Sequence, residues 1–429
     1  MEGRRDKSCV FGIFLKKMDG NIFFTSEPLT AERLSWLVEL LKYYTTRLFP
    51  ESLHHNPRTP TPPFTFFLLG DACNILIGRE HQRSLEIFFR LPCFRCIFDQ
   101  GDLHVRRISI EPFRIRYPGQ VIPIAPGGNL PGRSIWDCLM NTMGKTPGPP
   151  SIGFLQMRSP YMFQSSSCVV DLFRAAARTG ISPEFYGYLD GVHAMHRDQR
   201  PPHHVNIGEA LSDIYRVAFT KGLFPRYLIC QESAASRGYC TFSGDNGRVV
   251  SASLIPQARI KSLDHIVSRF CMSHRIFSHT SFFVDVVVQR KIPSVKFSAE
   301  RKKPSLVILA SHSPYGTEFT KGAISLAVAC AHQNIPTRIV FIEDGVYTLT
   351  GSESPAGMWA DMDMHALIEA TSRMDTLEYY VYTPSSQARG IAINPSIKGV
   401  CPVNPTEFSQ VLLTPPAGLE VDHQRVLVF

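Results

Sequence analysis

The chain has 429 residues, of which 44% are hydrophobic and 11% aromatic, so we expect about three domains with packed cores and exclude a disordered chain. The formal net charge of +8 at pH 7 is spread along this length, which argues against a direct nucleic-acid groove. The 11 cysteines lack the dense spacing of a secreted disulfide scaffold, and no run approaches the roughly 20 apolar residues that cross a membrane, so a cytoplasmic protein with reduced thiols and no membrane contact is expected.

The first unit is expected to span residues 1–147. Its opening apolar run, 9–15, is short for the core of a signal peptide and lacks a cleavage site of small residues, so it is interpreted as a strand. Apolar residues recur at helical spacing in 30–42, which predicts a helix that begins at Thr30. Further strands are predicted at 64–69 and 85–89, and a further helix at 134–143.

The second unit, 148–290, and the third, 304–429, alternate strands with helices, and a charged linker at 291–303 joins them. Such alternation is typical of parallel sheets covered by helices on both faces. In the second unit, strands are predicted at 152–156, 185–189, 227–229 and within 276–287, and helices at 168–177, 207–220 and 263–270. In the third unit, strands are predicted at 305–310, 338–342, 377–382 and 425–429, and helices at 322–331 and 364–374.

The second and third units repeat the same short motifs at matching spacing. A Ser-Pro-Tyr motif ends at Tyr161 and again at Tyr315, and an Asp-Gly-Val motif follows each at the same distance, at Asp190 and Asp344. These motifs fall after predicted strands. Because ligands of parallel sheets bind beyond the carboxyl ends of the strands, the repeat indicates where a site is to be sought.

Cys230 lies where an apolar strand runs into a predicted helix start. Free backbone N–H groups and the positive end of the helix dipole stabilise a thiolate at such a place, and Arg237 adds a positive charge within two turns. This favours a nucleophilic thiol, and the alternative is a buried structural cysteine. Cys240 is close enough in sequence to form a disulfide with Cys230, or it is a loop thiol without a role.

Two further positions share the frame of Cys230, in which a glycine follows at a fixed distance: Cys93 in the first unit and Tyr382 in the third. Cys93 and Cys96 form a Cys-x-x-Cys pattern, which is a second thiol site, half of a zinc site or the remnant of a lost site. No further zinc ligands are near in sequence, so no metal is predicted. Tyr382 excludes thiol chemistry in the third unit.

Three polar residues are expected near Cys230 in this topology. Asp190 ends a strand, where it either orients a pocket group or caps a helix. Tyr161 and His193 belong to adjacent loops and are expected to support the pocket. His193 also begins a run that includes His196, His203 and His204, and the prolines and polarity of this run favour a solvated loop over a metal site.

The sequence resembles the DsrE/TusD family of sulfur-relay proteins. In the third unit the resemblance rests on residues 313–318, 341–347, 387–391 and 425–429. In the second unit it rests on residues 159–161, 188–192, Cys230 and 236–238, and in the first, more weakly, on residues 68–72 and the Cys93-x-x-Cys96 pattern. The first unit is therefore interpreted as a degenerate copy.

The resemblance implies small three-layer α/β modules with mostly parallel sheets, which assemble as trimers that stack in pairs. Three modules in tandem would form a pseudo-trimer within one chain, and two chains would stack as a homodimer. In the sulfur-carrying members a cysteine before the helix that leads to Arg-Gly holds sulfane sulfur as a persulfide, and Cys230 stands at that place. The implied partners are the sulfur donor and acceptor proteins of a relay, and no cofactor is implied.

Two other functions remain open from the sequence. If the role of the chain is reflected in the two units that depart from the frame of Cys230, the chain is a non-catalytic oligomeric scaffold of a sulfur-transfer complex. It is a thiol–disulfide redox protein if Cys93 and Cys96 are the working pair.

Overall fold

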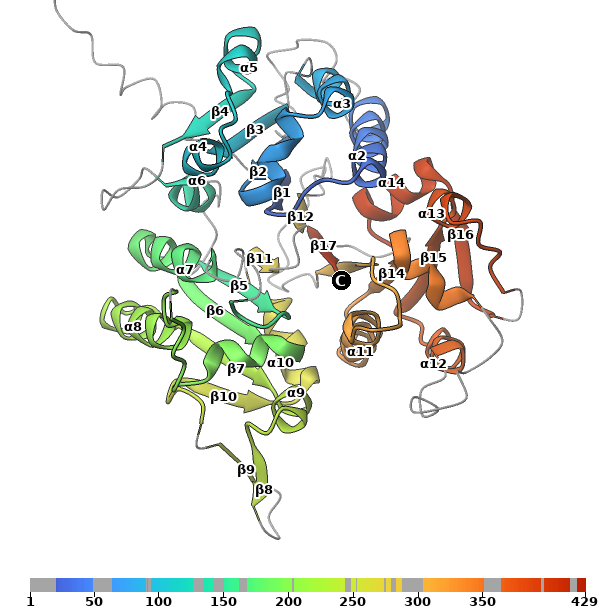
Figure 1. Ribbon diagram of the computed structural model, residues 1–429. Helices are drawn as coiled ribbons and strands as arrows, with labels where there is room; N and C mark the ends of the chain where they lie inside the picture. Colours follow the sequence, from blue (N-terminus) through green and yellow to red (C-terminus); the bar gives the residue numbers. More distant parts are fainter. Residues whose placement is uncertain are drawn as a thin grey trace, which may run out of the picture.

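The fold is taken from a computed structural model of the chain (Figure 1). The structure describes residues 21–48, 64–89, 91, 94–125, 134–141, 150–161, 168–202, 204–243, 248–251, 253–273, 275–278, 283–287, 304–350, 364–394, 397–416 and 423–429. We call 21–141 the first segment, 150–278 the second segment and 304–429 the third segment. In Figure 1 they form a blue-to-cyan, a green-to-yellow and an orange-to-red lobe, and the chain ends where the lobes meet.

The first segment alternates strands and helices. Helix α2 begins where the Thr30 hydroxyl accepts a hydrogen bond from the backbone N–H of Arg33, as the sequence predicted. The elements are β1 (Asn21–Thr25), α2 (Ala31–Tyr43) with a π turn (Tyr44–Leu48), β2 (Phe64–Leu68), the 3₁₀ helix η3 (Gly70–Leu76), α3 (Arg79–Phe89), β3 (Phe94–Asp99), α4 (Gln100–Val105), α5 (Glu111–Arg116), β4 (Val121–Ile124) and α6 (Ile135–Asn141).

The second and third segments follow the same order. The second holds β5 (Ser151–Gln156), α7 (Cys168–Thr179), β6 (Ser182–Gly187), the 3₁₀ helix η5 (Leu189–Met195), α8 (Ile207–Thr220), β7 (Arg226–Cys230), α9 (Gln231–Ser236), the hairpin β8 (Thr241–Ser243) and β9 (Arg248–Val250), β10 (Ala258–Lys261), α10 (Leu263–Phe270) and β11 (Arg275–Ser278). The third holds β13 (Ser305–Ala310), α11 (Phe319–His332), β14 (Thr337–Phe341), the 3₁₀ helix η7 (Glu343–Leu349), α12 (Met364–Thr371), β15 (Leu377–Tyr382), α13 (Thr383–Ala388), β16 (Val400–Val403), α14 (Pro405–Leu413) and β17 (His423–Val428).

The strands of the second segment form a parallel five-stranded sheet in the order β10-β7-β6-β5-β11. The third segment has the same order, β16-β15-β14-β13-β17, and the first has β4-β3-β2-β1. Strand β12 (Phe283–Val287) pairs antiparallel with both β1 and β17, and so joins the first and third segments in one ten-stranded sheet. The expected strand within 276–287 is therefore two strands in two sheets.

Three helix pairs join the segments in a ring. Helix α6 packs on α7, α10 packs on α11, and α14 packs on α2, so that the last helix of each segment contacts the first helix of another. Trp36 of α2 meets Phe408 of α14 edge-on, with ring centroids 5.6 Å apart. Arg178 of α7 donates a hydrogen bond of 2.8 Å to Asp137 of α6, whose side chain is 2% exposed. Apolar burial, together with an ion pair whose carboxylate is buried, thus joins the segments.

The structure corrects one element of the first segment. Residues 85–89 were expected to form a strand, but they are the end of helix α3. Leu85, Phe88 and Phe89 recur at helical spacing, and Phe88 and Phe89 are buried while Ile87 is 49% exposed. The helical spacing of the apolar residues in this run therefore outweighs the preference of the individual residues for strands. The expected strand at 9–15 and the whole of the expected linker, 291–303, lie outside the described residues. No helix within the described part of the chain is both long and apolar enough to cross a membrane.

Candidate functional site

Strands β3, β7 and β15 occupy corresponding places in their sheets, and each ends at the residue that caps the next helix. That residue is Asp99 before α4, Cys230 before α9 and Tyr382 before α13. The Asp99 side chain accepts a hydrogen bond from the backbone N–H of Asp102, whereas Cys230 and Tyr382 make no such cap bond. The thiol at this position is therefore specific to the second segment.

The sequence frame assigned Cys93 to this position, and that assignment is wrong. The residue of the first segment that corresponds to Cys230 is Asp99, because it is Asp99 that ends β3 at the carboxyl edge of the sheet. Cys96 lies inside β3, is fully buried, and has a pKa raised well above its usual range by burial. Cys93 lies outside the described residues.

Cys230 is buried, with an exposed fraction of 0%. Its Sγ donates a hydrogen bond of 3.0 Å to Oε2 of Glu232. The pKa of the Cys230 thiol is raised to about 11, mainly by burial and also by Glu232, although hydrogen bonds from Ser233 to the thiolate lower it. The thiolate expected at this helix start is therefore disfavoured near neutral pH, because desolvation outweighs the hydrogen bonds from Ser233.

The loop that faces Cys230 begins with a residue in the left-handed region. Leu189 has a φ of 50°, and its backbone N–H donates to Oγ of Ser233 at 3.0 Å. Glu343 of η7 repeats both features, with a φ of 49° and a bond of 3.0 Å to Ser385. In the first segment Gly70 has a φ of 51° and donates to Asp102. The turn is strained at Leu189 and Glu343 but not at the glycine, and it fixes the carboxyl ends of the strands in each segment.

The glycine of each Asp-Gly-Val motif has a steric explanation. A Cβ atom on Gly191 would collide with the backbone carbonyl of Gln156, and one on Gly345 would collide with that of Ala310. Both carbonyls belong to the ends of neighbouring strands, β5 and β13. The motif therefore brings the 3₁₀ helix against the adjacent strand.

Asp190 and Arg237 form an ion pair of 2.7 Å, so Asp190 binds an arginine and is not the residue that caps η5. The third segment repeats this pair with Asp344 and Arg389 at 2.9 Å. In the first segment Arg106 likewise binds Asp71, at 2.8 Å.

Arg237 and Arg389 also bind a carboxylate of another segment. Arg237 pairs with Glu318, which caps α11, at 2.7 Å. Arg389 pairs with Glu32 in the first turn of α2 at 3.0 Å. Arg237 thus lies in the same short helical region as Cys230, but two carboxylates hold its guanidinium.

Tyr161 and His193 lie in the loops around this region. The Tyr161 hydroxyl accepts a hydrogen bond from the backbone N–H of Ile207 at 3.1 Å and donates one to Gln199, so it holds the start of α8. His193 Nδ1 lies 2.6 Å from the hydroxyl of Tyr239, and burial is the main cause that lowers its pKa. Among the described residues, no group of His, Cys, Asp and Glu side chains is arranged to bind a metal ion.

The sequence did not predict a polar contact at the junction of all three segments. Arg158, after β5, pairs with Glu27, after β1, at 2.6 Å. Nη2 of Arg158 also lies 3.4 Å from Nε2 of His312, after β13. Both Arg158 and His312 directly precede a Ser-Pro motif. This shared position is the sequence feature from which the contact could have been predicted.

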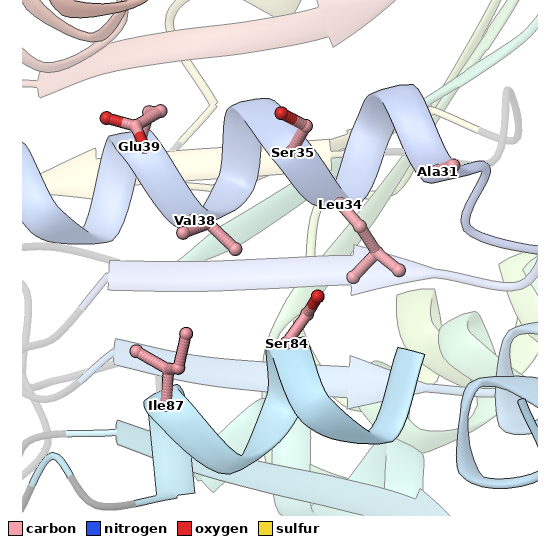
Figure 2. Close-up of a pocket in the computed structure, with 7 residues that line it drawn as sticks. All are labelled: Ala31, Leu34, Ser35, Val38, Glu39, Ser84 and Ile87. Atoms are coloured by element: carbon pink, nitrogen blue, oxygen red, sulfur yellow. The ribbon is translucent and has the colours of Figure 1, made fainter. Parts of the chain in front are cut away.

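A shallow groove between α2 and α3 contains none of the predicted site residues. Figure 2 shows the groove between the two helices. It is lined by Ala31, Leu34, Ser35, Val38, Glu39, Ser84 and Ile87. Nothing in its lining identifies a ligand.

The fold and site define an α/β protein with mostly parallel sheets, in which a buried thiol lies at the carboxyl end of one strand. In the comparison with known proteins, residues 305–414 match the DsrE/DsrF-like family. A TusC homolog from Pseudomonas aeruginosa is 27% identical over 88 residues, which are 20% of this chain and 73% of that protein. The crystal structure of the ychN protein from E. coli aligns with 29% of this chain and 99% of its own, at 23% identity and a TM-score of 0.25. The third segment is thus similar to the DsrE/DsrF-like family, whose members are generally linked to sulfur relay.

Proposed function

We propose that this protein is a component of a sulfur relay and that Cys230 carries sulfane sulfur as a persulfide. The observation that supports this is the place of Cys230, at the carboxyl end of β7 and immediately before α9. Ligands of parallel sheets bind at this edge. The family similarity of the third segment adds the reaction class.

The transfer needs a thiolate on Cys230 and a persulfide on a donor protein. Glu232 is the group that accepts the thiol proton, since its Oε2 already accepts the S–H hydrogen bond at 3.0 Å. The Cys230 sulfur then forms a bond to the outer sulfur of the donor persulfide, and the donor S–S bond breaks. The donor leaves as a thiolate and takes up the proton, so that no net oxidation occurs. Transfer to the acceptor protein is the same exchange from Cys230.

Burial of Cys230 requires a movement before this exchange. The thiol is 0% exposed, and α9 is the element that follows it. We propose that the donor displaces α9, a helix of only six residues, to reach the sulfur. The Arg237–Glu318 pair, in which the Glu318 side chain is 61% exposed, is the contact between segments that such a movement would break.

We further propose that the chain is three tandem modules, 1–147, 148–290 and 304–429, with 291–303 as linker, and that they form a pseudo-trimer. The ring of helix contacts and the recurrence of strand order support this arrangement. Stacking of two chains and a cytoplasmic location stay predictions from the sequence. The proposed partners are donor and acceptor proteins that present persulfide or thiol groups.

The test is loading with a cysteine desulfurase and free cysteine, followed by intact mass measurement without reductant. We expect a gain of about 32 Da, one sulfur atom, that disappears on reduction. Cys230→Ser should remove the adduct, while Cys240→Ser, which changes another buried thiol of the second segment, should keep it. An adduct that survives Cys230→Ser would contradict the proposal.

A non-catalytic scaffold is the second candidate, and the burial and raised pKa of Cys230 favour it. In that case the helix-cap position after the strand has only a structural role, and it is filled by Asp99, Cys230 or Tyr382 in the three segments. The scaffold predicts partner binding that Cys230→Ser leaves unchanged and no sulfur adduct on the wild type. Thiol–disulfide chemistry by Cys93 and Cys96 is a weaker alternative, because Cys96 is enclosed within β3.

A further inference from the structure

Helix α11 of the third segment lies against the loop that faces Cys230. Tyr188 immediately precedes η5, and its hydroxyl donates a hydrogen bond of 3.1 Å to the backbone carbonyl of Gly322 in α11. A Cβ atom added to Gly322 would lie 2.8 Å from Cδ1 of Leu189, the first residue of η5. The lack of a side chain at Gly322 thus lets the helix approach this loop closely.

The register of the sheet places Tyr188 beside Cys230. Strands β6 and β7 are parallel with Gly187 opposite Ile229, so the next residue of each strand, Tyr188 and Cys230, follows at the carboxyl end. Both are buried, with exposed fractions of 4% and 0%. Burial is the main cause that raises the pKa of Tyr188, so its hydroxyl stays protonated and remains a donor. Tyr188 therefore links the neighbourhood of the thiol to the third segment.

A tyrosine beside the cap position occurs only in the segment that carries the thiol. The corresponding neighbours are Leu69 beside Asp99 in the first segment and Ile342 beside Tyr382 in the third. Neither a leucine nor an isoleucine side chain can donate a hydrogen bond to a neighbouring helix. The hydroxyl and the thiol are thus found together, which points to a role of Tyr188 at the Cys230 site.

Two contacts between the segments differ in what would break them. A movement of α9 alone would break the Arg237–Glu318 pair, in which the Glu318 side chain is 61% exposed. It would leave the Tyr188–Gly322 hydrogen bond in place, because Tyr188 follows β6 and is not part of α9. A separation of α11 from the second segment would break both contacts. The buried hydrogen bond therefore distinguishes these two ways to reach Cys230.

We propose that Tyr188 is a positioning residue that holds the third segment against the Cys230 site, and that the thiol becomes accessible only when α11 separates from the second segment. The movement of α9 then accompanies this separation. The third segment, which has Tyr382 in place of a thiol, thus controls the access of a partner to the thiol of the second. The importance of this step for sulfur transfer rests on the proposed function, in which a donor protein must reach Cys230.

The experiment measures the rate at which iodoacetamide alkylates Cys230 in the folded full-length chain, read by peptide mass spectrometry. Because the thiol is buried, this rate follows the population of the open form. Tyr188→Phe removes one buried hydrogen bond that only the closed form makes, so we expect alkylation about fivefold faster than in the wild type. Glu318→Gln weakens the exposed contact of the same interface and should give an increase of about twofold.

Tyr227→Phe is the matched control. Its hydroxyl donates a buried hydrogen bond of 2.8 Å to the backbone carbonyl of Leu211, entirely within the second segment. Both tyrosine variants should lose a similar free energy of unfolding in urea, but Tyr227→Phe should leave the alkylation rate of Cys230 unchanged.

Two results would overturn the proposal. Equal acceleration in both tyrosine variants would show that Cys230 is reached by general unfolding. An unchanged rate in Tyr188→Phe would show that α9 opens without the third segment. Because alkylation needs no sulfur donor, either result is independent of whether Cys230 can be loaded with sulfur.

Discussion

Arg237 and Glu318 join the second segment to the third through an ion pair of 2.7 Å. Arg389 and Glu32 make the corresponding contact between the third segment and the first at 3.0 Å. The Glu318 side chain is 61% exposed, and solvent screening makes such pairs weak. Arg237 therefore defines how the second and third segments meet more than it stabilises the fold.

The pair of Arg33 with Glu343 should contribute more. Arg33 donates two hydrogen bonds, of 2.7 and 2.8 Å, to the two carboxylate oxygens, and the side chains are 9% and 13% exposed. We expect Arg33→Met to lower the free energy of unfolding by about 3 kcal/mol, because it leaves a buried carboxylate without its partner. Glu318→Gln is the matched control, with a loss below about 1 kcal/mol. Equal losses in urea unfolding would contradict this ranking.

Glu232 should control the ionisation of Cys230. Replacement by Gln removes a negative charge that raises the pKa of the thiol, so the pKa should fall from about 11. Ser233→Ala should act in the opposite direction, because hydrogen bonds from Ser233 lower that pKa. The measurement is the rate of Cys230 alkylation as a function of pH, read by peptide mass spectrometry. If Glu232→Gln does not shift the alkylation profile along the pH axis, the carboxylate does not affect the pKa of the thiol.

Acidification should weaken the contact at the junction of the three segments. Burial is the main cause that lowers the pKa of His312, and the Arg158 guanidinium lowers it further. Below a pH of about 6.5 the unfolded chain therefore binds the proton more readily than the folded protein, and stability falls as the pH falls. The slope from this group is at most about 1.4 kcal/mol per pH unit.

His312→Gln tests this dependence, since a glutamine does not titrate. Urea unfolding at several values between pH 5 and pH 8 should give a shallower dependence in the variant than in the wild type. The pKa of His193 is lowered as well, so part of the slope should remain. A slope unchanged by the substitution would show that His312 does not titrate differently in the two states.

The Asp-Gly-Val glycines should tolerate no side chain. Gly191→Ala is expected to cost about 3 kcal/mol or more, because its Cβ would displace the backbone of Gln156. Gly119→Ala is the matched control, as a Cβ there meets nothing within 4 Å. Thermal unfolding of both variants gives the comparison. A Gly191 variant as stable as the control would show that the 3₁₀ helix can move away from β5.

The sequence predicted the second and third segments well because their motifs repeat at fixed spacing. It failed in the first segment, where Asp99 replaces cysteine and the nearby Cys93 gave a false match. It also could not predict β12, since antiparallel pairing with β1 and β17 joins strands far apart in the chain. Local pattern reports periodicity but carries no information on such pairing.

The state of Cys230 was the other failure of prediction. A helix start favours a thiolate, but the balance depends on burial, which the sequence around Cys230 does not fix. The junction of Arg158 with Glu27 and His312 was missed for a similar reason, because its members come from three segments. Contacts between segments decide both features.

The most direct test of the central claim is the position of the sulfur after loading by a cysteine desulfurase. The protein is alkylated without reductant, digested, and the peptide that contains Cys230 is analysed by mass spectrometry. The proposal predicts an alkylated persulfide on this peptide, about 32 Da heavier than the alkylated thiol, and its decrease when an acceptor thiol is added. An unmodified Cys230 in a sample whose desulfurase is active would contradict the proposal and leave the scaffold as the function that the structure supports.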